Sequence, residues 1–113
     1  MKNIRLLLSV LAIALTSGGY VHAGNLNNNT ITSVSFNSTG FFLSASNWAN
    51  PGECDKTNAV VLLNTDANYD KAYALLLAAY ISGKVVTGYS DGCTTHDGLT
   101  YNTIRGTKYL VVQ

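Results

Sequence analysis

The longest helical pattern in this chain is NYDKAYALLLAAYISG, residues Asn68 to Gly83. The run contains no proline and no interior glycine, and it is rich in Ala and Leu, which favour helices. Gly83 suits the left-handed conformation that ends a helix. At the other end, side-chain oxygens that can accept the first free N–H groups come from Asn64, Thr65, Asp66 and Asn68. The pattern predicts one helix, and the remainder of the fold must supply a surface for it to pack on.

The predicted helix is apolar on both faces. Residues at three- and four-residue spacing form one stripe, made of Tyr69, Ala72, Tyr73, Leu76, Ala79 and Tyr80. A domain of this size has few layers with which to cover a second apolar face. The helix therefore either lies deep in the core or meets another chain. In the second case, the interface between copies is expected at Ala74, Leu77, Ala78 and Ile81.

Residues 1–23 have the pattern of a signal peptide. Two basic residues give a positive start, residues 6–15 are apolar, and Val21-His22-Ala23 is a cleavage site of the small-residue type. The apolar run is too short to cross a bilayer as a helix, and an uncleaved amphipathic anchor is the alternative. We expect a secreted or periplasmic protein in which residues 24–113 form a single domain.

Cys54 and Cys93 are the only two cysteines, and each lies just after a turn pair. In an exported chain, an isolated pair of this kind predicts a disulfide. The bridge would close a loop worth roughly 4 kcal/mol in chain entropy, which is a large share of what a small core supplies. The alternative, a redox-active or metal-binding pair, lacks the Cys-x-x-Cys spacing and the accompanying histidines.

Five runs outside the helix have the alternating or apolar pattern of strands. They are Thr30–Phe36, Phe41–Ser46, Asn58–Leu63, Lys84–Ser90 and Thr107–Val112. Residues 25–29 are expected to be a polar lead-in, and residues 91–98 a turn-rich loop. Residues 101–104 are either the first half of the last strand or a separate short strand, so the path of residues 99–106 stays open.

The predicted order is three strands, one helix and two strands. An OB-fold, a small five-stranded barrel with a helix at one end, has this order and would explain a helix that is apolar on both faces. The competing arrangement is an open antiparallel sheet with the helix on one face. The fold class is therefore mostly β with one helix, and the β-β-β-α-β-β order favours an OB-like five-stranded barrel.

The segment YDKAYALLLAAYISGKVVTGYSDGC, residues 69–93, carries a family resemblance. Its helix, glycine, Val-rich strand and cysteine resemble a segment of small secreted bacterial proteins related to the B subunits of pentameric toxins, such as the subtilase cytotoxin. The resemblance implies an OB-fold, assembly into a homo-oligomer such as a pentamer, and recognition of a host glycan or glycoprotein by the outer barrel surface. No position of this chain matches the family's sugar-binding residues, so none is assigned from it.

Charge and residue types disfavour several classes of function. Without the signal peptide, five Lys and Arg stand against six Asp and Glu, which gives a net charge of −1. No basic stripe remains, and this argues against nucleic acids and anionic membranes as partners. His96 is the one histidine of residues 24–113, and the cysteines are expected to be oxidised, so acid–base and nucleophilic sites lack their usual parts. We expect no catalytic residue, no metal and no cofactor.

Binding is the favoured class of function. Seven Tyr, one Trp and many Asn, Ser and Thr suit a surface that stacks on sugars or on another protein. The candidate ligand contacts are Trp48, Tyr89 and His96. Trp48 lies in a polar loop, where it either faces a ligand or plugs the barrel end, and Tyr89 could equally be core. We expect a glycan- or receptor-binding domain, and the alternative is a monomeric periplasmic domain that binds or inhibits another protein.

Overall fold

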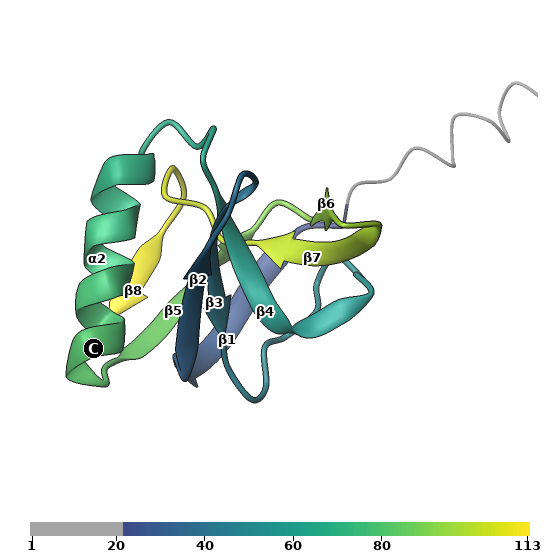
Figure 1. The fold of residues 1–113 in the computed structure, drawn as a ribbon. Coiled ribbons are helices and arrows are strands. Elements are labelled where there is room, and N and C mark those ends of the chain that lie inside the picture. The colour runs from purple at the N-terminus through teal and green to yellow at the C-terminus, as the bar shows by residue number, and fades with distance from the viewer. Residues whose placement is uncertain (1–21) are drawn as a thin grey trace, which may run out of the picture.

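The computed structural model describes residues 22–113, which fold into eight strands and one helix (Figure 1). This part of the chain is mostly β with a single helix, as predicted. Apart from His22 and Ala23, the predicted signal peptide lies outside the described residues. The elements are β1 Gly24–Thr30, β2 Ser33–Phe36, β3 Gly40–Ser44, β4 Lys56–Leu63, α2 Tyr69–Ser82, β5 Val85–Ser90, β6 Cys93–His96, β7 Leu99–Thr103 and β8 Leu110–Val112.

The strands form two sheets. One has the order β1-β5-β8 and the other the order β2-β3-β4-β7-β6. Neighbouring strands are antiparallel except for β4 and β7, which are parallel. The chain passes from one sheet to the other through only two residues at 31–32, between β1 and β2, and at 91–92, between β5 and β6; it also changes sheet between β4 and β5 and between β7 and β8. Neither sheet closes on itself, so two sheets stand where a single five-stranded barrel was predicted.

Two segments that were predicted to be irregular are strands. β1 occupies the predicted polar lead-in, and β6 occupies half of the predicted loop at residues 91–98. Leu26 accounts for the first, because its side chain is buried in the core while the backbone around it pairs with β5. β6 pairs along its whole length with β7, which is a strand separate from β8. Strand preference depends on the pairing partner, so these polar sequences gave no local signal.

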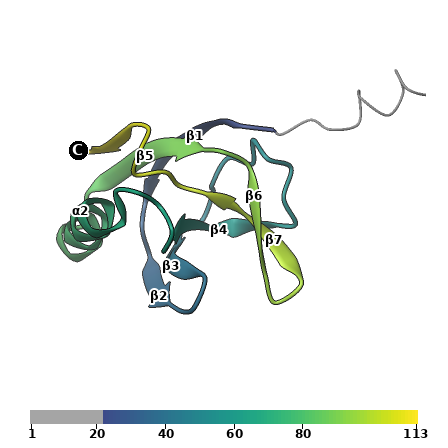
Figure 2. The same ribbon diagram turned by 90° about the horizontal axis from the view of Figure 1, so that it is seen from above.

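The helix packs on a core to which both sheets contribute. Figure 2 shows α2 at one side of the domain, next to β5 and β8, and the β6–β7 hairpin at the opposite side. The helix buries Ala72, Leu76 and Ala79, which are half of the predicted stripe. They join residues of both sheets in the main core cluster, including Leu26, Phe41, Leu43, Val60, Leu62, Val86 and Ile104.

The far side of the five-stranded sheet carries a second, smaller cluster. Phe42, Ala59 and Val61 are buried there, and Leu63 and Tyr101 pack against them. β4 is therefore buried on both faces, which is typical of a strand with a continuous apolar run such as Ala59 to Leu63. Consecutive β4 residues alternate between the two clusters, with Val60 and Leu62 in one and Ala59 and Val61 in the other.

The helix ends as predicted, and of the four predicted acceptors at its start, Asp66 accepts a backbone N–H whereas Asn68 does not cap the helix. Gly83 adopts the left-handed conformation with φ 68°, and the backbone N–H groups at this cap donate to the carbonyls of Ala79 and Tyr80. At the start, Asn68 makes no side-chain cap and donates its amide to the Gly106 carbonyl at 2.9 Å. Asp66 instead accepts the Asn68 N–H at 2.9 Å. No helix within residues 22–113 has the length and hydropathy needed to cross a membrane.

Cys54 and Cys93 form the predicted disulfide, and their Cα atoms lie 5.7 Å apart. The bridge joins the loop before β4 to the first residue of β6. Gly52 packs closely against it, because a Cβ there would lie 2.9 Å from Cys54 Sγ and 2.8 Å from Asn102 Oδ1. The disulfide therefore fixes one end of the β6–β7 hairpin to the body of the domain.

Candidate functional site

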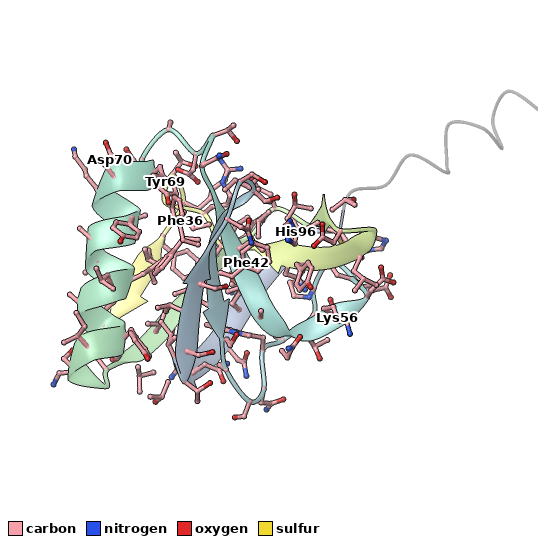
Figure 3. The ribbon with its side chains drawn as sticks, in the orientation of Figure 1. Phe36, Phe42, Lys56, Tyr69, Asp70 and His96 are labelled. Atoms are coloured by element: carbon pink, nitrogen blue, oxygen red, sulfur yellow. A yellow bond between two sulfur atoms is a disulfide. The ribbon has the colours of Figure 1, made fainter. Side chains whose placement is uncertain are left out.

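The tips of two hairpins meet on the side of the five-stranded sheet that faces away from the helix. One tip is the β2–β3 turn, residues 37–39, and the other is the β6–β7 turn, residues 97–98. Figure 3 shows His96 and Phe42 on this side of the molecule, whereas Tyr69 and Asp70 lie on the helix. We call the cluster the hairpin-tip site. Its members are Asn37, Thr39, Phe42, His96, Asp97 and Tyr101.

The β2–β3 turn is held in one conformation by its own residues. The Asn37 N–H donates to the Gly40 carbonyl at 3.1 Å, and Asn37 Oδ1 accepts the Thr39 N–H at 2.9 Å. An asparagine that bonds to the backbone two residues ahead is typical of a turn. Gly40 has φ 154°, and a Cβ there would lie 2.1 Å from the Leu62 carbonyl oxygen. Because Oδ1 is engaged, the Asn37 amide points its Nδ2 away from the turn.

The β6–β7 turn has two residues, Asp97 and Gly98. Both have positive φ, 50° and 76° respectively, and Asp-Gly is a preferred pair for a two-residue hairpin with this geometry. The turn places His96 at the end of β6, directly opposite Leu99. The turn predicted within residues 91–98 is therefore confirmed at Asp97-Gly98, whereas the residues before it form the strand β6.

His96 joins the two tips. Its Nδ1 lies 2.9 Å from Thr39 Oγ1, and its Nε2 lies 3.5 Å from Asn37 Nδ2. The Asp97 Oδ2 atom lies 3.4 Å from the same Nε2. The His96 side chain is 21% exposed, whereas Asp97 is 88% exposed. One half-buried imidazole thus contacts both turns, which lie about sixty residues apart in the sequence.

Aromatic rings form the floor of the site. The Phe42 ring lies 5.0 Å from the His96 ring and 5.2 Å from the Tyr101 ring, the second pair in edge-to-face geometry. Such pairs contribute about 0.5–1.5 kcal/mol beyond the area that they bury. Phe42 is buried, while His96 and Tyr101 are half-buried. The two half-buried rings therefore present part of their surface to solvent beside the polar groups of the turns.

The site offers rings, hydroxyls, an amide and a carboxylate within one small area. Thr39, His96 and Asp97 form a hydroxyl–imidazole–carboxylate series, which is the order found in hydrolytic triads. The carboxylate is however solvent-exposed rather than buried behind the imidazole. In residues 22–113, no group of three or more His, Cys, Asp or Glu side chains is placed to hold a metal ion. The arrangement suits recognition of a polar ligand with ring faces.

Trp48 lies in the core and not at a surface. It is 3% exposed, and its Nε1–H donates to the Leu43 carbonyl at 3.0 Å. The prediction that Trp48 contacts a ligand is therefore corrected in favour of the alternative, a buried plug. A tryptophan in a polar loop is buried here because the core has room for its ring and a carbonyl for its N–H.

Tyr89 belongs to a different surface. Its ring lies 6.3 Å from the Tyr109 ring, and Lys108 Nζ lies 5.7 Å from its centre. None of the contacts described for Tyr89 includes His96. Of the three predicted ligand contacts, only His96 lies in the hairpin-tip site.

Sequence reasoning missed most of the hairpin-tip site. Asn37 and Thr39 were not among the predicted site residues, and Phe42 was placed only within the predicted strand Phe41–Ser46. Side chains of a strand alternate between its two faces, and the neighbours of Phe42 in the strand face the helix. The position of Phe42 on the opposite face could therefore have been predicted from the sequence. The contact between the two turns could not be predicted from the sequence, because no local pattern links residue 39 to residue 96.

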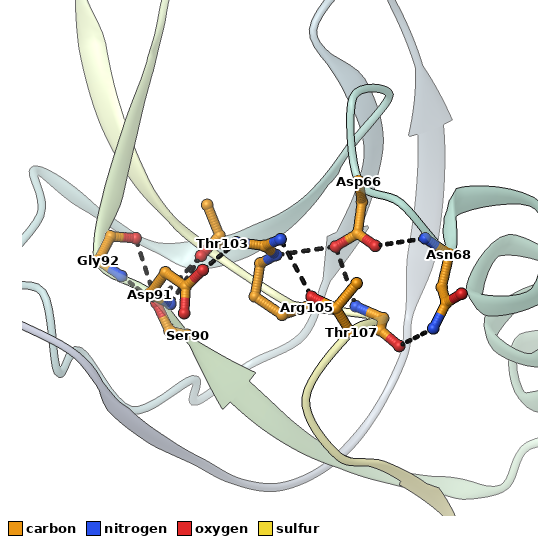
Figure 4. Close-up of polar contacts among 9 residues, drawn as sticks. Asp66, Asn68, Ser90, Asp91, Gly92, Thr103, Arg105 and Thr107 are labelled. Carbon is orange, nitrogen blue, oxygen red and sulfur yellow. Dashed lines mark hydrogen bonds and ion pairs between the residues drawn. The ribbon is translucent and has the colours of Figure 1, made fainter.

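A second polar cluster lies at the start of the helix (Figure 4). Arg105 Nε donates to Asp66 Oδ2 at 2.8 Å, and a second guanidinium nitrogen pairs with Asp91. Burial raises the pKa of Asp66, but hydrogen bonds from Arg105 and from the backbone N–H groups of Asn68 and Gly106 outweigh it. The pKa therefore lies below its usual range. The same ion pair raises the pKa of Arg105. These groups satisfy one another, and we assign the cluster a structural role.

A surface hollow of about 430 Å³ lies beside this cluster at the first turn of α2. It is lined by residue 64 and residues 66–71, among them Asp66 and Asp70. The Tyr69 hydroxyl is buried and has no hydrogen-bond partner, and burial is the first cause of its raised pKa. The hollow lacks the convergent rings of the hairpin-tip site, and the hairpin-tip site is therefore the first candidate for ligand binding.

Comparisons with protein-family models, with curated proteins and with solved structures gave no match for this chain.

Proposed function

We propose that this protein is an exported, non-catalytic domain that binds an oligosaccharide at the hairpin-tip site. The observation that carries the proposal is the contact between Thr39 and His96, which brings two turns together over the rings of Phe42 and Tyr101. Sugars present hydroxyls that exchange hydrogen bonds with amides and hydroxyls, and apolar faces that stack on rings. The site holds both kinds of group.

The topology supports an OB-like interpretation of the two sheets. Only two residues separate β1 from β2 and β5 from β6, so each pair can be counted as one bent strand. Six strands then result, and the first five run β1/β2, β3, β4, β5/β6 and β7, with the helix between the third and the fourth; β8 is a sixth strand that pairs with β5. In OB-folds, the connections between strands 1 and 2 and between strands 4 and 5 bind oligonucleotides or oligosaccharides. Here these connections are the two turns of the hairpin-tip site.

Charge favours sugars over nucleic acids at this site. Binding to a phosphate backbone depends on Lys and Arg that neutralise phosphates. The charged side chain that contacts His96 within the site is a carboxylate, Asp97, and residues 24–113 carry a net charge of −1. A host glycan or glycoprotein is therefore the proposed partner, in keeping with the resemblance to toxin B subunits.

A glycan array tests the proposal directly. We expect the purified protein to bind a subset of the immobilised oligosaccharides, and Tyr101→Ala to weaken binding by about 1 kcal/mol, roughly fivefold, through the lost ring contact. Tyr109→Ala is the matched control, since Tyr109 is a partly exposed tyrosine next to Tyr89 and away from the site. Equal loss in both variants, or no binding by the wild-type protein, would contradict the proposal.

We further propose that the outer face of α2 joins copies of the chain, as in a toxin-like ring. Support comes from exposed apolar side chains there, with Ile81 76% and Leu75 40% exposed, next to exposed Ala74 and Ala78. Leu77 packs partly against the core and contributes less to such a face.

Native mass separates this arrangement from its rival, a monomeric periplasmic domain that binds or inhibits another protein. We expect a homo-oligomer at tens of micromolar and a monomer after Ile81→Lys, because a buried lysine charge is costly at an apolar interface. A wild-type monomer at that concentration would favour the rival. Lys71→Ala on the same helix is the control that should leave the mass unchanged.

A further inference from the structure

The Asn37 amide fixes which nitrogen of His96 carries the proton in the neutral ring. Its Oδ1 accepts the Thr39 N–H, so the group that faces His96 Nε2 is the Nδ2 donor. A donor requires an acceptor, so in the neutral imidazole Nε2 is unprotonated and accepts this hydrogen bond, and the proton is on Nδ1. The Nδ1–H can then donate to Thr39 Oγ1 at 2.9 Å. In this state His96 bonds twice to the β2–β3 turn.

Protonation of His96 reverses the contact at Nε2. The imidazolium has a donor at both nitrogens, so its Nε2–H meets the Asn37 Nδ2 donor. The Asp97 carboxylate, 3.4 Å from the same nitrogen, is an acceptor for that proton. The preferred partner of Nε2 thus moves from the β2–β3 turn to the β6–β7 turn. An imidazole changes its charge between about pH 5 and 8.

Few other groups compete with this exchange. Asp97 is the charged side chain in contact with the ring among residues 22–113, on the turn that follows β6. From β3 the ring meets Phe42, and from the β2–β3 turn it meets Asn37 and Thr39. None of these three titrates between pH 5 and 8. Tyr101 on β7 packs against Phe42, whose ring lies beside His96.

We propose that His96 is a pH-sensitive joint, which holds the two turns together when neutral and loosens them when protonated, so that acid weakens the hairpin-tip site. The inference rests on the proposed function only in its last clause. The affinity for sugar is expected to fall about fivefold or more from pH 7.5 to pH 5.5. A roughly fivefold change is at the lower end of the usual coupling between two binding events, here the binding of a proton and the binding of a sugar.

Nuclear magnetic resonance tests the joint without any sugar. We expect the Asn37 side-chain amide and the Thr39 backbone amide to shift with the same midpoint as the His96 ring, and hydrogen exchange in residues 37–39 to accelerate about fivefold or more on the acid side. Ring titration that leaves residues 37–39 unchanged would overturn the proposal.

Two conservative variants sharpen the test. Asn37→Asp keeps the oxygen that caps the turn but replaces the donor with an acceptor, so acid should now tighten the joint and slow exchange in residues 37–39. Asp97→Asn keeps a side chain that tolerates positive φ and removes the competing acceptor, so the acid response should shrink. If hydrogen exchange in residues 37–39 of the Asn37→Asp variant accelerates in acid as it does in the wild-type protein, the assigned partners of Nε2 are wrong.

The array, repeated at both pH values, separates the two proposals. Binding that is equal at pH 7.5 and pH 5.5, with His96 titrating between them, overturns the joint's control of sugar binding and leaves sugar binding itself intact. An array without signal at either pH rejects the proposed function, and the exchange measurement then still decides whether the joint opens.

Discussion

At the scale of single residues, Asp66 shows how one carboxylate can organise several segments. Its side chain is fully buried and accepts hydrogen bonds from Arg105, from the Gly106 N–H and from the Asn68 N–H. These donors belong to the start of the helix and to the chain between β7 and β8. Burying a charge is costly unless it is paired in this way. These hydrogen bonds and the ion pair with Arg105 therefore hold the start of the helix against the sheets.

Asp66→Asn should destabilise the protein by about 2–3 kcal/mol. Breaking a fully buried ion pair costs roughly 3–5 kcal/mol, and the expected loss is smaller because Arg105 keeps Asp91 and remains partly exposed. Urea unfolding measures the change. Asp70→Asn, one helical turn away and exposed, should cost much less, and equal losses would contradict the role given to Asp66.

The same carboxylate should shape the pH dependence of stability. Its folded pKa lies below the ordinary value of 3.8, so near that pH the unfolded chain binds more protons than the folded one. The stabilisation is complete above about pH 5, and it is lost as the pH falls through the folded pKa. Asp66→Asn should therefore flatten the decline in unfolding free energy between pH 5 and pH 2. An unchanged decline would show that other carboxyl groups cause it.

At the scale of elements, two glycines with positive φ have different reasons to be glycine. Gly83 ends the helix with φ 68°, and a Cβ added there meets no atom within 4 Å. Gly40 begins β3, and a Cβ added there would overlap the Leu62 carbonyl oxygen of the paired strand β4. Gly83 is required only for its left-handed backbone conformation, whereas Gly40 is also required because a side chain there would collide with β4.

Replacement by alanine should separate these two requirements. Gly83→Ala should cost about 1 kcal/mol, since only the left-handed conformation is penalised. Gly40→Ala should cost more than about 3 kcal/mol, because backbone strands must move apart as well. Thermal or urea unfolding of both variants provides the comparison. A similar cost at the two positions would contradict the packing argument at β3.

At the scale of the whole molecule, long-range contacts hold the hairpin-tip site in place. The disulfide anchors the first residue of β6, β6 pairs with β7, and β7 runs parallel to β4. The β6–β7 hairpin therefore extends from an anchored base, and its tip reaches the β2–β3 turn. A domain of about 90 residues has a small core, so a covalent link contributes a large share of its stability.

The double variant Cys54→Ala, Cys93→Ala should lose about 4 kcal/mol of unfolding free energy, which is the chain-entropy estimate for a loop of this length. Urea unfolding of the variant and of the oxidised protein gives the difference. The reduced wild-type protein is the control and should behave like the variant. A loss below about 1 kcal/mol would show that β6 is held mainly by its pairing with β7.

The amino-acid sequence by itself determined the features that depend on neighbours along the chain. The helix from Tyr69 to Ser82, its glycine end, the doubly buried β4 and the turn formers at residues 97–98 all follow from local pattern, because spacing and backbone preference act over a few residues. Only the tertiary structure decided that polar β1 and β6 are strands, that Trp48 is core, and that Thr39 meets His96. Those outcomes depend on which distant segment supplies the hydrogen bonds and the cavity, and no short stretch of sequence carries that information.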